Sequence, residues 1–277
     1  MRTVVVIAVF MALVAPLLAH PSAAARSAPG NAEGQNTAPK GVLGPIDALG
    51  QEVKRPAAPT GPAPRLPDGT INLGDGLWVY LPPSFGPDLA RGLKEGEVLP
   101  LLPSAQELIG SRKPADDPVN WCLPLGVLRA SPYPFRFIQN YTHKKPTHMY
   151  ILTEWMGTYR QIFLDGRTHP PDLDPSWYGH SIGWFEKDTL AIDSVGFNGK
   201  AWYDRRGTPQ TDKLHTIERW TRVDAGTLVQ EVTVDDPGAF SRPFTVTFRL
   251  RLSQPGDEMI EYVCAENNQY GVASGVK

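Results

Sequence analysis

The segment FTVTFRLRL, Phe244 to Leu252, decides the fold class of this chain. Its apolar residues alternate with threonine and arginine at every second position. Because successive side chains of a β-strand point to opposite faces, this pattern predicts a strand with one face buried. The runs LHTIERWTR, TLVQEVTV and MIEYVC are similarly rich in β-branched and aromatic residues. The C-terminal half of the chain therefore predicts a mainly β protein.

Short turn signals separate these runs, among them DG at 165–166, DAG at 224–226 and PG at 255–256. Strands joined by tight turns pair antiparallel, because parallel pairing needs a long crossover. A meander of roughly eight to ten strands can hide both of its edges by closing on itself. We therefore expect an antiparallel meander closed into a calycin- or lipocalin-like barrel, with an extended N-terminal wrap. A β-sandwich is the alternative.

The N-terminal 25 of the 277 residues have the pattern of a signal peptide. Arg2 precedes the apolar run TVVVIAVFMALVAPLLA, and Ala23 to Ala25 fit a small-residue cleavage site. The apolar run is short and contains Pro16, so we expect no stable membrane insertion once the signal is removed. Residues 26–65, rich in Pro, Ala and Gly, predict a disordered linker. We expect 66–277 to form a single β-rich domain of an exported protein, periplasmic or extracellular.

The charge and cysteine content limit the possible binding partners, disulfides and metal sites of the protein. Lys and Arg number 27 against 29 Asp and Glu, without a basic run, which argues against nucleic acid. The two cysteines, Cys122 and Cys264, could form one disulfide in an oxidising compartment or remain two buried thiols. No H-E-x-x-H or C-x-x-C spacing is present, so we expect neither a metal nor a cofactor.

Three motifs suggest a relationship. CLPLG at 122–126, DGRTHP at 165–170 and GHSIGWFEKDTLAID at 179–193 resemble a family of secreted bacterial proteins of unknown function. The resemblance covers about residue 66 to the C-terminus. It implies an exported protein with a β-rich, calycin- or lipocalin-like domain. It implies no established activity, so no catalytic residue is carried over from it.

Candidate catalytic residues lie in and around the same motifs: His169, His180, Ser181 and Asp193. Ser181 matches G-x-S-x-G, but that pattern exposes a nucleophile only at a strand–turn–helix elbow. The sequence that follows predicts strand–turn–strand, so we interpret Ser181 as a strand residue. If the elbow formed, His169 or His215 would be the base and Asp193 its orienting acid.

A second candidate site lies inside the expected barrel. Glu218 and Arg219 must point to opposite faces, and Trp220 shares the face of Glu218. An inward carboxylate needs a partner, and Arg160, Arg219 and Arg249 are available. The result is either a structural ion pair or a polar anchor in an apolar cavity. The predicted ligand-binding residues are Arg160, Trp177, His180, Ser181, Trp202 and Glu218.

Three functions remain open. The leading hypothesis is an exported β-barrel that binds a small, largely apolar ligand. The second is a hydrolase or lyase that uses a histidine–acid pair in the same cleft. The third is an envelope-associated interaction module, which an exposed apolar patch outside the barrel would favour.

Overall fold

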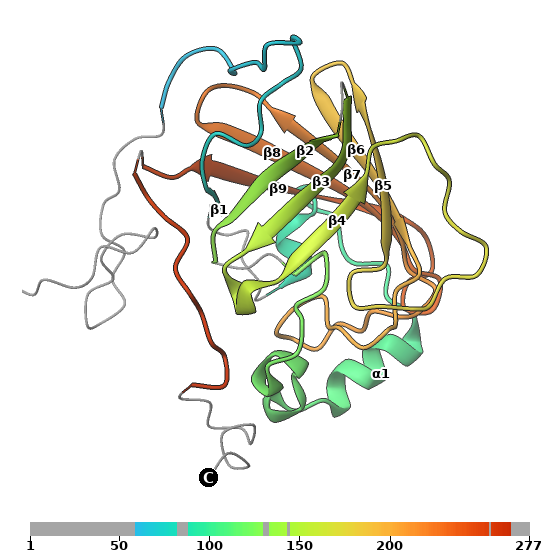
Figure 1. Ribbon diagram of the computed structural model, residues 1–277. Coiled ribbons are helices and arrows are strands. Elements are labelled where there is room, and N and C mark those ends of the chain that lie inside the picture. The colour runs from blue at the N-terminus through green and yellow to red at the C-terminus, as the bar shows by residue number, and fades with distance from the viewer. Residues whose placement is uncertain (1–58, 82–87, 130–132, 143–144, 255, 267–277) are drawn as a thin grey trace, which may run out of the picture. The chain divides into compact units, whose positions relative to one another are not determined.

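The computed structural model describes residues 59–81, 88–129, 133–142, 145–254 and 256–266. The expected signal peptide, 1–25, and most of the expected linker lie outside these residues. Nine strands close into a barrel in chain order (Figure 1). The mainly β, closed architecture predicted from the alternating pattern is confirmed, and it is consistent with a lipocalin-like barrel.

The barrel has one parallel joint. Its strands are β1 (Trp78–Tyr80), β2 (Phe135–Thr142), β3 (Lys145–Thr153), β4 (Tyr159–Phe163), β5 (His180–Glu186), β6 (Thr189–Val195), β7 (His215–Arg222), β8 (Thr227–Asp235) and β9 (Phe244–Leu252). Neighbouring strands pair antiparallel except β4 and β5, which pair in parallel. The prediction of a purely antiparallel meander is wrong there. Parallel neighbours need a returning connection, and residues 164–179 supply it along the outside of the wall (Figure 1).

Strand β9 shows how far alternation predicts burial. From Phe244 to Leu250 the apolar side chains are buried and the intervening threonines and Arg249 are exposed. The pattern ends at Arg251, which is buried although its sequence position predicts exposure. Arg251 pairs with Val79 of β1, and Val79 is buried in a cluster with Leu77 and Met259. The C-terminal segment thus covers the outer face at this point, which strand periodicity cannot reveal.

Short helices wrap one end of the barrel. They are η1 (Leu89–Gly92), α1 (Pro103–Ser111), η2 (Pro114–Asp116) and η3 (Pro118–Trp121), with η4 (Trp155–Gly157) following β3. Pro103 occupies the first turn of α1, where its missing N–H costs nothing. The backbone N–H of Leu102 donates to the carbonyl of Ala239 at 2.9 Å and ties this wrap to the barrel. Within the described residues, no helix has the length and apolar character needed to cross a membrane.

Residues 59–65, which the sequence assigns to the linker, already contact the barrel. Arg65 forms an ion pair with Asp188 at 2.7 Å. Ala63 packs against the interior core, and the carbonyl of Gly61 accepts a hydrogen bond from the N–H of Ala225 at 3.0 Å. The packed part of the chain therefore begins before residue 66.

Two hydrophobic clusters fill most of the interior. One lies within the barrel and includes Trp78, Phe137 and Trp220. The other joins the inner faces of β8 and β9 to the wrap, with Leu89 and Phe240 among its members. The small cavity described below borders both clusters.

Candidate functional site

A buried ion pair lies on the inner wall of the barrel. Arg160 Nη2 of β4 is 2.6 Å from Glu218 Oε1 of β7, and the two side chains are 7% and 0% exposed. Both point inward because their strand neighbours, Tyr159 and Arg219, face outward. Of the three arginines that the sequence offers, Arg160 is thus the partner of the inward carboxylate.

Two serines complete the surroundings of Arg160. Its Nε donates to Ser181 Oγ at 3.0 Å and its Nη2 to Ser194 Oγ at 2.7 Å. Ser181 lies in β5, which is followed by β6, so the strand interpretation of G-x-S-x-G is confirmed. A Cβ at Gly183 would lie 2.8 Å from Ile162 Cγ2, so this glycine permits close packing of β5 against β4.

The two oxygens of the buried Glu218 carboxylate have different partners. Oε2 accepts hydrogen bonds from Trp220 Nε1 at 3.1 Å and from Gln230 Nε2 at 3.0 Å. Tyr80 donates to Gln230 Oε1 at 2.8 Å, and burial, followed by the charge of Glu218, raises the pKa of Tyr80 so that it remains a donor. Among the described residues, Oε1 has the ion pair with Arg160 and no aligned hydrogen-bond donor.

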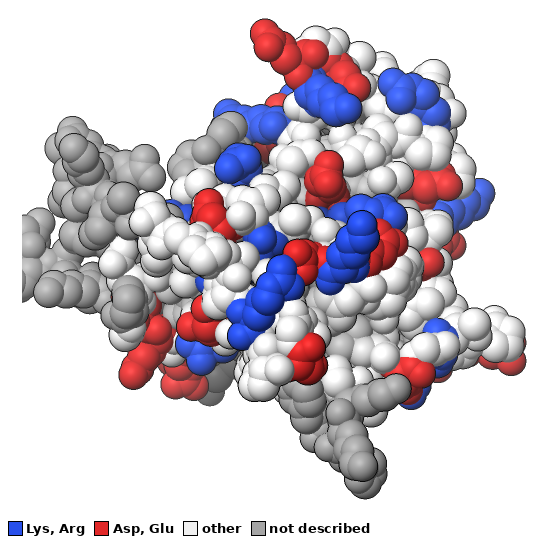
Figure 2. All heavy atoms as spheres, turned by 90° about the horizontal axis from the view of Figure 1, so that it is seen from above, with Lys and Arg blue, Asp and Glu red and all other residues white. Residues whose placement is uncertain are grey.

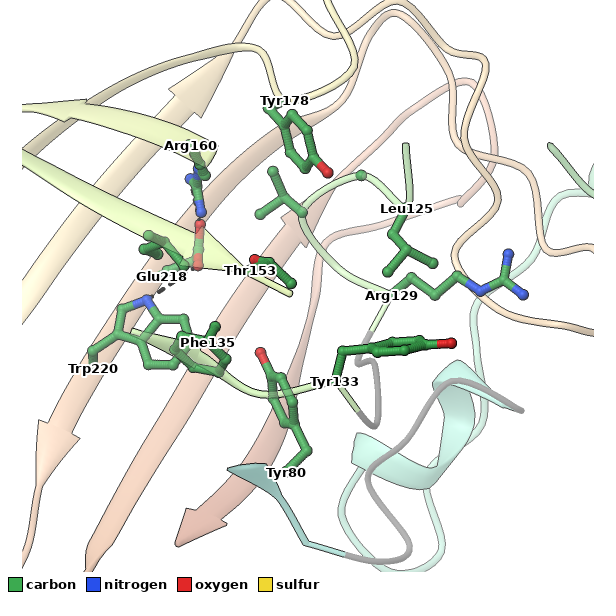
Figure 3. A pocket seen from close by; sticks show the side chains of 13 residues that line it. Tyr80, Leu125, Arg129, Tyr133, Phe135, Thr153, Arg160, Tyr178, Glu218 and Trp220 are labelled. Carbon is green, nitrogen blue, oxygen red and sulfur yellow. Dashed lines mark hydrogen bonds and ion pairs between the residues drawn. The ribbon is translucent and has the colours of Figure 1, made fainter. Parts of the chain in front are cut away.

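This pair borders a cavity of about 70 Å³ at the wrapped end of the barrel. Figure 3 shows the pair and Trp220 on one side and Tyr133 and Arg129 on the other. Burial raises the pKa of Tyr178, which also lines the cavity. The cavity therefore combines an aromatic wall with a charged anchor.

The segment that closes the cavity, residues 122–129, is fixed at three places. Cys122 forms a disulfide with Cys264. Arg129 pairs with Asp117 at 2.8 Å, and both side chains are buried. Gly126 has φ 77°, and a Cβ there would lie 3.0 Å from Ala201 Cβ, so a larger residue would strain the closure.

The predicted ligand-binding residues separate into two groups. Arg160 and Glu218 line the cavity, and Ser181 lies one hydrogen bond behind Arg160. Trp177, His180 and Trp202 do not line it. Trp202 is buried, with the Arg112 guanidinium 4.6 Å from its ring centre, and His180 faces outward because Ser181 faces inward.

Sequence reasoning missed several cavity residues and their supports, including Tyr80, Tyr178, Ser194 and Gln230. Two of them carried a usable signal. In TLVQEVTV, Gln230 lies between Leu228 and Val232 on the buried face, and in TLAIDSV, Ser194 follows Leu190 and Ile192 on the buried face. A polar residue on an inward face predicts a buried hydrogen-bond network.

The candidate catalytic histidines meet on the outer wall instead. His169 Nδ1 is 2.8 Å from His180 Nδ1, and His169 Nε2 is 3.3 Å from Asp193 Oδ1. His215 Nε2 is 2.9 Å from the same Asp193 oxygen. These four residues form the histidine chain. Their neighbours Ser181, Ser194 and Thr216 are buried, so the chain lies outside the barrel and does not share the cavity.

Hydrogen-bond chemistry assigns the protons of the neutral histidine chain. If His169 Nε2 donates to the Asp193 carboxylate, its Nδ1 must accept from His180 Nδ1. His180 Nε2 is then left with a free lone pair. Burial, His169 and Arg167 all lower the pKa of His180. Within the described part of the chain, no group of three or more His, Cys, Asp or Glu side chains could hold a metal ion.

A larger hollow, about 400 Å³, lies between η4 and the C-terminal segment. It is more open than the barrel cavity, and its one buried carboxyl group, Glu154, already accepts from the N–H of Ile260 at 3.0 Å. Burial raises the pKa of Glu154. The cavity in the barrel, where Glu218 Oε1 has only its ion pair with Arg160, is therefore the stronger candidate site.

Fold and site together define a closed nine-stranded β-barrel with a buried arginine–glutamate pair beside its cavity. The chain matches no family model, no curated protein and no solved structure. The resemblance to secreted bacterial proteins of unknown function stays a prediction.

Proposed function

We propose that this protein binds a small molecule in the barrel cavity, largely apolar but with one hydrogen-bond-donating group. The observation that carries the proposal is the buried Glu218 carboxylate, which borders the cavity and whose Oε1 has only its ion pair with Arg160. A ligand hydroxyl or amine would add a hydrogen bond to this oxygen beside the arginine. Such a convergent polar group in an aromatic wall is typical of small-molecule sites.

The apolar part of the ligand would contact Leu125, Phe135, Ile151 and Trp220, which all line the cavity. The cavity of about 70 Å³ is smaller than the roughly 150 Å³ that admits benzene. A ligand with an aromatic ring therefore requires residues 122–129 to shift outward. The shift would have to occur between the two ends of this segment, because the disulfide holds Cys122 and the buried pair with Asp117 holds Arg129.

Trp220 provides a direct readout of binding. We expect at least one compound from a panel of small phenols, aromatic amines and alcohols to change the tryptophan emission of dialysed protein saturably. At a ligand concentration of 100 times Kd, the melting temperature should rise with a stabilisation of about 2.7 kcal/mol. Trp220→Phe should remove the emission change, whereas Trp184→Phe, on the exposed outer wall, should keep it. A panel in which no compound alters emission or melting temperature contradicts the proposal.

We also propose that the chain is exported to the periplasm or the extracellular medium. The N-terminal signal pattern supports this, although residues 1–25 lie outside the described part of the structure. The disulfide between Cys122 and Cys264 is independent support, because such bonds persist in oxidising compartments. In the face drawn in Figure 2, basic and acidic side chains are interspersed, which does not favour a nucleic-acid partner there.

The histidine chain supports acid–base chemistry as a second candidate function. His180 Nε2 would accept a proton, the shared hydrogen bond would pass charge to His169, and Asp193 would stabilise the resulting imidazolium. The 2.8 Å contact between the two histidines supports this assignment. A hydrolase or lyase based on it would work on the outer wall, because these histidines do not line the cavity.

A general base must be unprotonated at the working pH, so the titration of His180 tests the second candidate. We expect His180 to titrate below 6.5, the ordinary value for histidine. The unfolded chain then binds more protons than the folded one just below pH 6.5, so the contribution of His180 to stability is lost as the pH falls from 6.5 towards its folded pKa.

Imidazole NMR signals give the measurement. Arg167→Gln should raise the pKa of His180, because the Arg167 charge lowers it. Arg206→Gln removes one arginine charge from an exposed ion pair with Asp88. This variant should leave the pKa of His180 unchanged. If His180 titrates at or above 6.5 in the unmodified protein, its assignment as the proton acceptor is wrong.

A further inference from the structure

A second hollow, of about 390 Å³, lies at the edge of β2. Residues 72–74 and 136–139 line it, together with Leu66 and Met149. Within the described part of the chain, it shares no lining residue with the cavity beside Glu218. Its volume falls in the range of sites that hold small organic molecules. We call it the β2 hollow.

The β2 hollow arises where the pairing of β1 with β2 ends. β1 has three residues, and its pairing with β2 consists of Trp78 with Phe135. Beyond Phe135, no described residue pairs with this edge of β2 in a strand ladder. The chain before β1, blue in Figure 1, instead passes the edge at Gly74, where a Cβ would lie 2.8 Å from Phe137 O. A glycine is required for this approach, and the wall beside it has a gap.

Most of the lining of the β2 hollow is apolar. Phe137 and Met149 belong to the inward face and are each 1% exposed, whereas Ile138 points outward and is 40% exposed. Leu66 and Leu73 contribute from the chain before β1. A short hydrocarbon chain placed here would exchange water for contacts with all of these side chains.

Arg136 gives the β2 hollow an uncompensated positive charge. Among the described residues, its buried Nε has no hydrogen-bond acceptor, and no carboxylate lines the hollow. Its cross-strand partner on β3 is Leu152, which is apolar. The acids of the chain before β1 have other partners, since Asp68 accepts a backbone N–H at 2.9 Å and Asp75 pairs with Arg222 at 2.6 Å. A buried cationic donor without an acceptor is unfavourable, so the hollow suits an anion.

A second donor borders the same hollow. Asn72 Oδ1 accepts from the N–H of Gly74 at 2.9 Å, so the NH2 group of this side chain remains a donor. A guanidinium presents parallel N–H groups that match the two oxygens of a planar carboxylate. We propose that the β2 hollow binds an aliphatic monocarboxylate, with its carboxylate on Arg136 and its hydrocarbon chain on the apolar lining. This ligand differs from that of the barrel cavity, where the protein itself supplies the carboxylate.

Hexanoate tests the inference when it is titrated into protein labelled with 13C in its methionine and isoleucine methyl groups. We expect the NMR signals of Met149 and Ile138 to shift saturably below about 10 mM, since a ligand of so few atoms binds weakly. Hexan-1-ol and hexylamine lack the negative charge and should bind at least about tenfold more weakly. Butanoate should lose about fourfold in affinity for each missing methylene.

Substitution of Arg136 separates the charge from the apolar contacts. Arg136→Gln should weaken hexanoate binding at least about tenfold, because it removes a charge-assisted hydrogen bond, and Arg136→Lys should recover part of the loss. Arg249→Gln removes the same charge from the exposed outer face of β9 and should bind hexanoate like the wild type. Because Arg136 has no ion pair among the described residues, its variants should keep the wild-type melting temperature.

Five outcomes would overturn the inference. Three of them are no saturable shift with hexanoate, equal affinity for hexan-1-ol, and equal weakening by Arg249→Gln. The fourth is displacement of hexanoate by inorganic phosphate at constant ionic strength, which would indicate a general anion site. The fifth is a shift of Ile151, which lines the barrel cavity, without a shift of Met149 and Ile138, since hexanoate would then occupy that cavity instead.

Discussion

Glu218→Gln is expected to destabilise the fold by about 3–5 kcal/mol, because it leaves the Arg160 guanidinium buried without a counter-charge. Arg160 is 7% exposed and Glu218 is fully buried, so bulk solvent cannot compensate the lost charge. The glutamine side chain keeps the volume and can still accept from Trp220 or Gln230. Its NH2 group then faces the Arg160 guanidinium, so the loss reports the missing charge and acceptor at the Oε1 position rather than a cavity.

A double-mutant cycle measures the coupling free energy between Arg160 and Glu218 apart from their interactions with other residues. Arg160→Met should destabilise by a similar amount, since it isolates the Glu218 carboxylate. The double variant Arg160→Met/Glu218→Gln should be more stable than the sum of the two single losses predicts, with a coupling of about 0.5–3 kcal/mol. Urea unfolding at 25 °C gives the midpoints and slopes.

An exposed pair on β5 and β7, the two strands that flank β6, provides the control. Arg219 and Glu186 lie 3.4 Å apart with both side chains 42% exposed. Glu186→Gln should change stability by less than about 1 kcal/mol. If Glu218→Gln proved no more destabilising than Glu186→Gln, the buried pair would not have the energetic role given to it here.

Removal of the disulfide is expected to have the second large effect. Cys122 and Cys264 are 142 positions apart, and a cross-link over so long a loop restricts the unfolded chain by about 5 kcal/mol in the chain-entropy model. Cys264 lies beyond β9, in a segment held by the Ile260 hydrogen bond to Glu154 and by the ring of Tyr262 stacked on Trp155 at 5.1 Å.

The folded state of a reduced protein regains freedom in this segment, so the measured loss should fall below that figure, at about 3–4 kcal/mol. Urea unfolding with and without a reductant gives the difference, and Cys122→Ser/Cys264→Ser should match the reduced wild type. Identical midpoints under both conditions would contradict the expectation. Because Cys122 precedes the segment that closes the cavity, reduction should also increase proteolytic cleavage within residues 122–129.

The inner and outer faces of the strands were predictable from single residues. Glu218 and Trp220 share a face with Thr216 because strand neighbours alternate, and this required no knowledge of the partner strands. The same rule could have found Gln230. It failed at Arg251, where another part of the chain covers the outer face.

The composition of the candidate site was only half predictable. Arg160 and Glu218 were chosen because an inward carboxylate needs a cation, and that argument rests on burial alone. Trp177 and Trp202 were chosen from their density in loops, which indicates neither direction nor depth. Trp202 is buried beneath Arg112, and Trp177 does not line the cavity.

The sequence by itself determined a mainly β chain, the side on which each regular strand is buried, and the need for a counter-charge to Glu218. Only the tertiary structure decided the parallel joint between β4 and β5, the choice of Arg160 as the partner, and the meeting of His169, His180, His215 and Asp193 outside the barrel. The reason is physical: alternation is a property of neighbouring residues along one strand. Pairing and register, in contrast, arise from contacts between segments far apart in the chain, and their stability depends on the whole closed sheet.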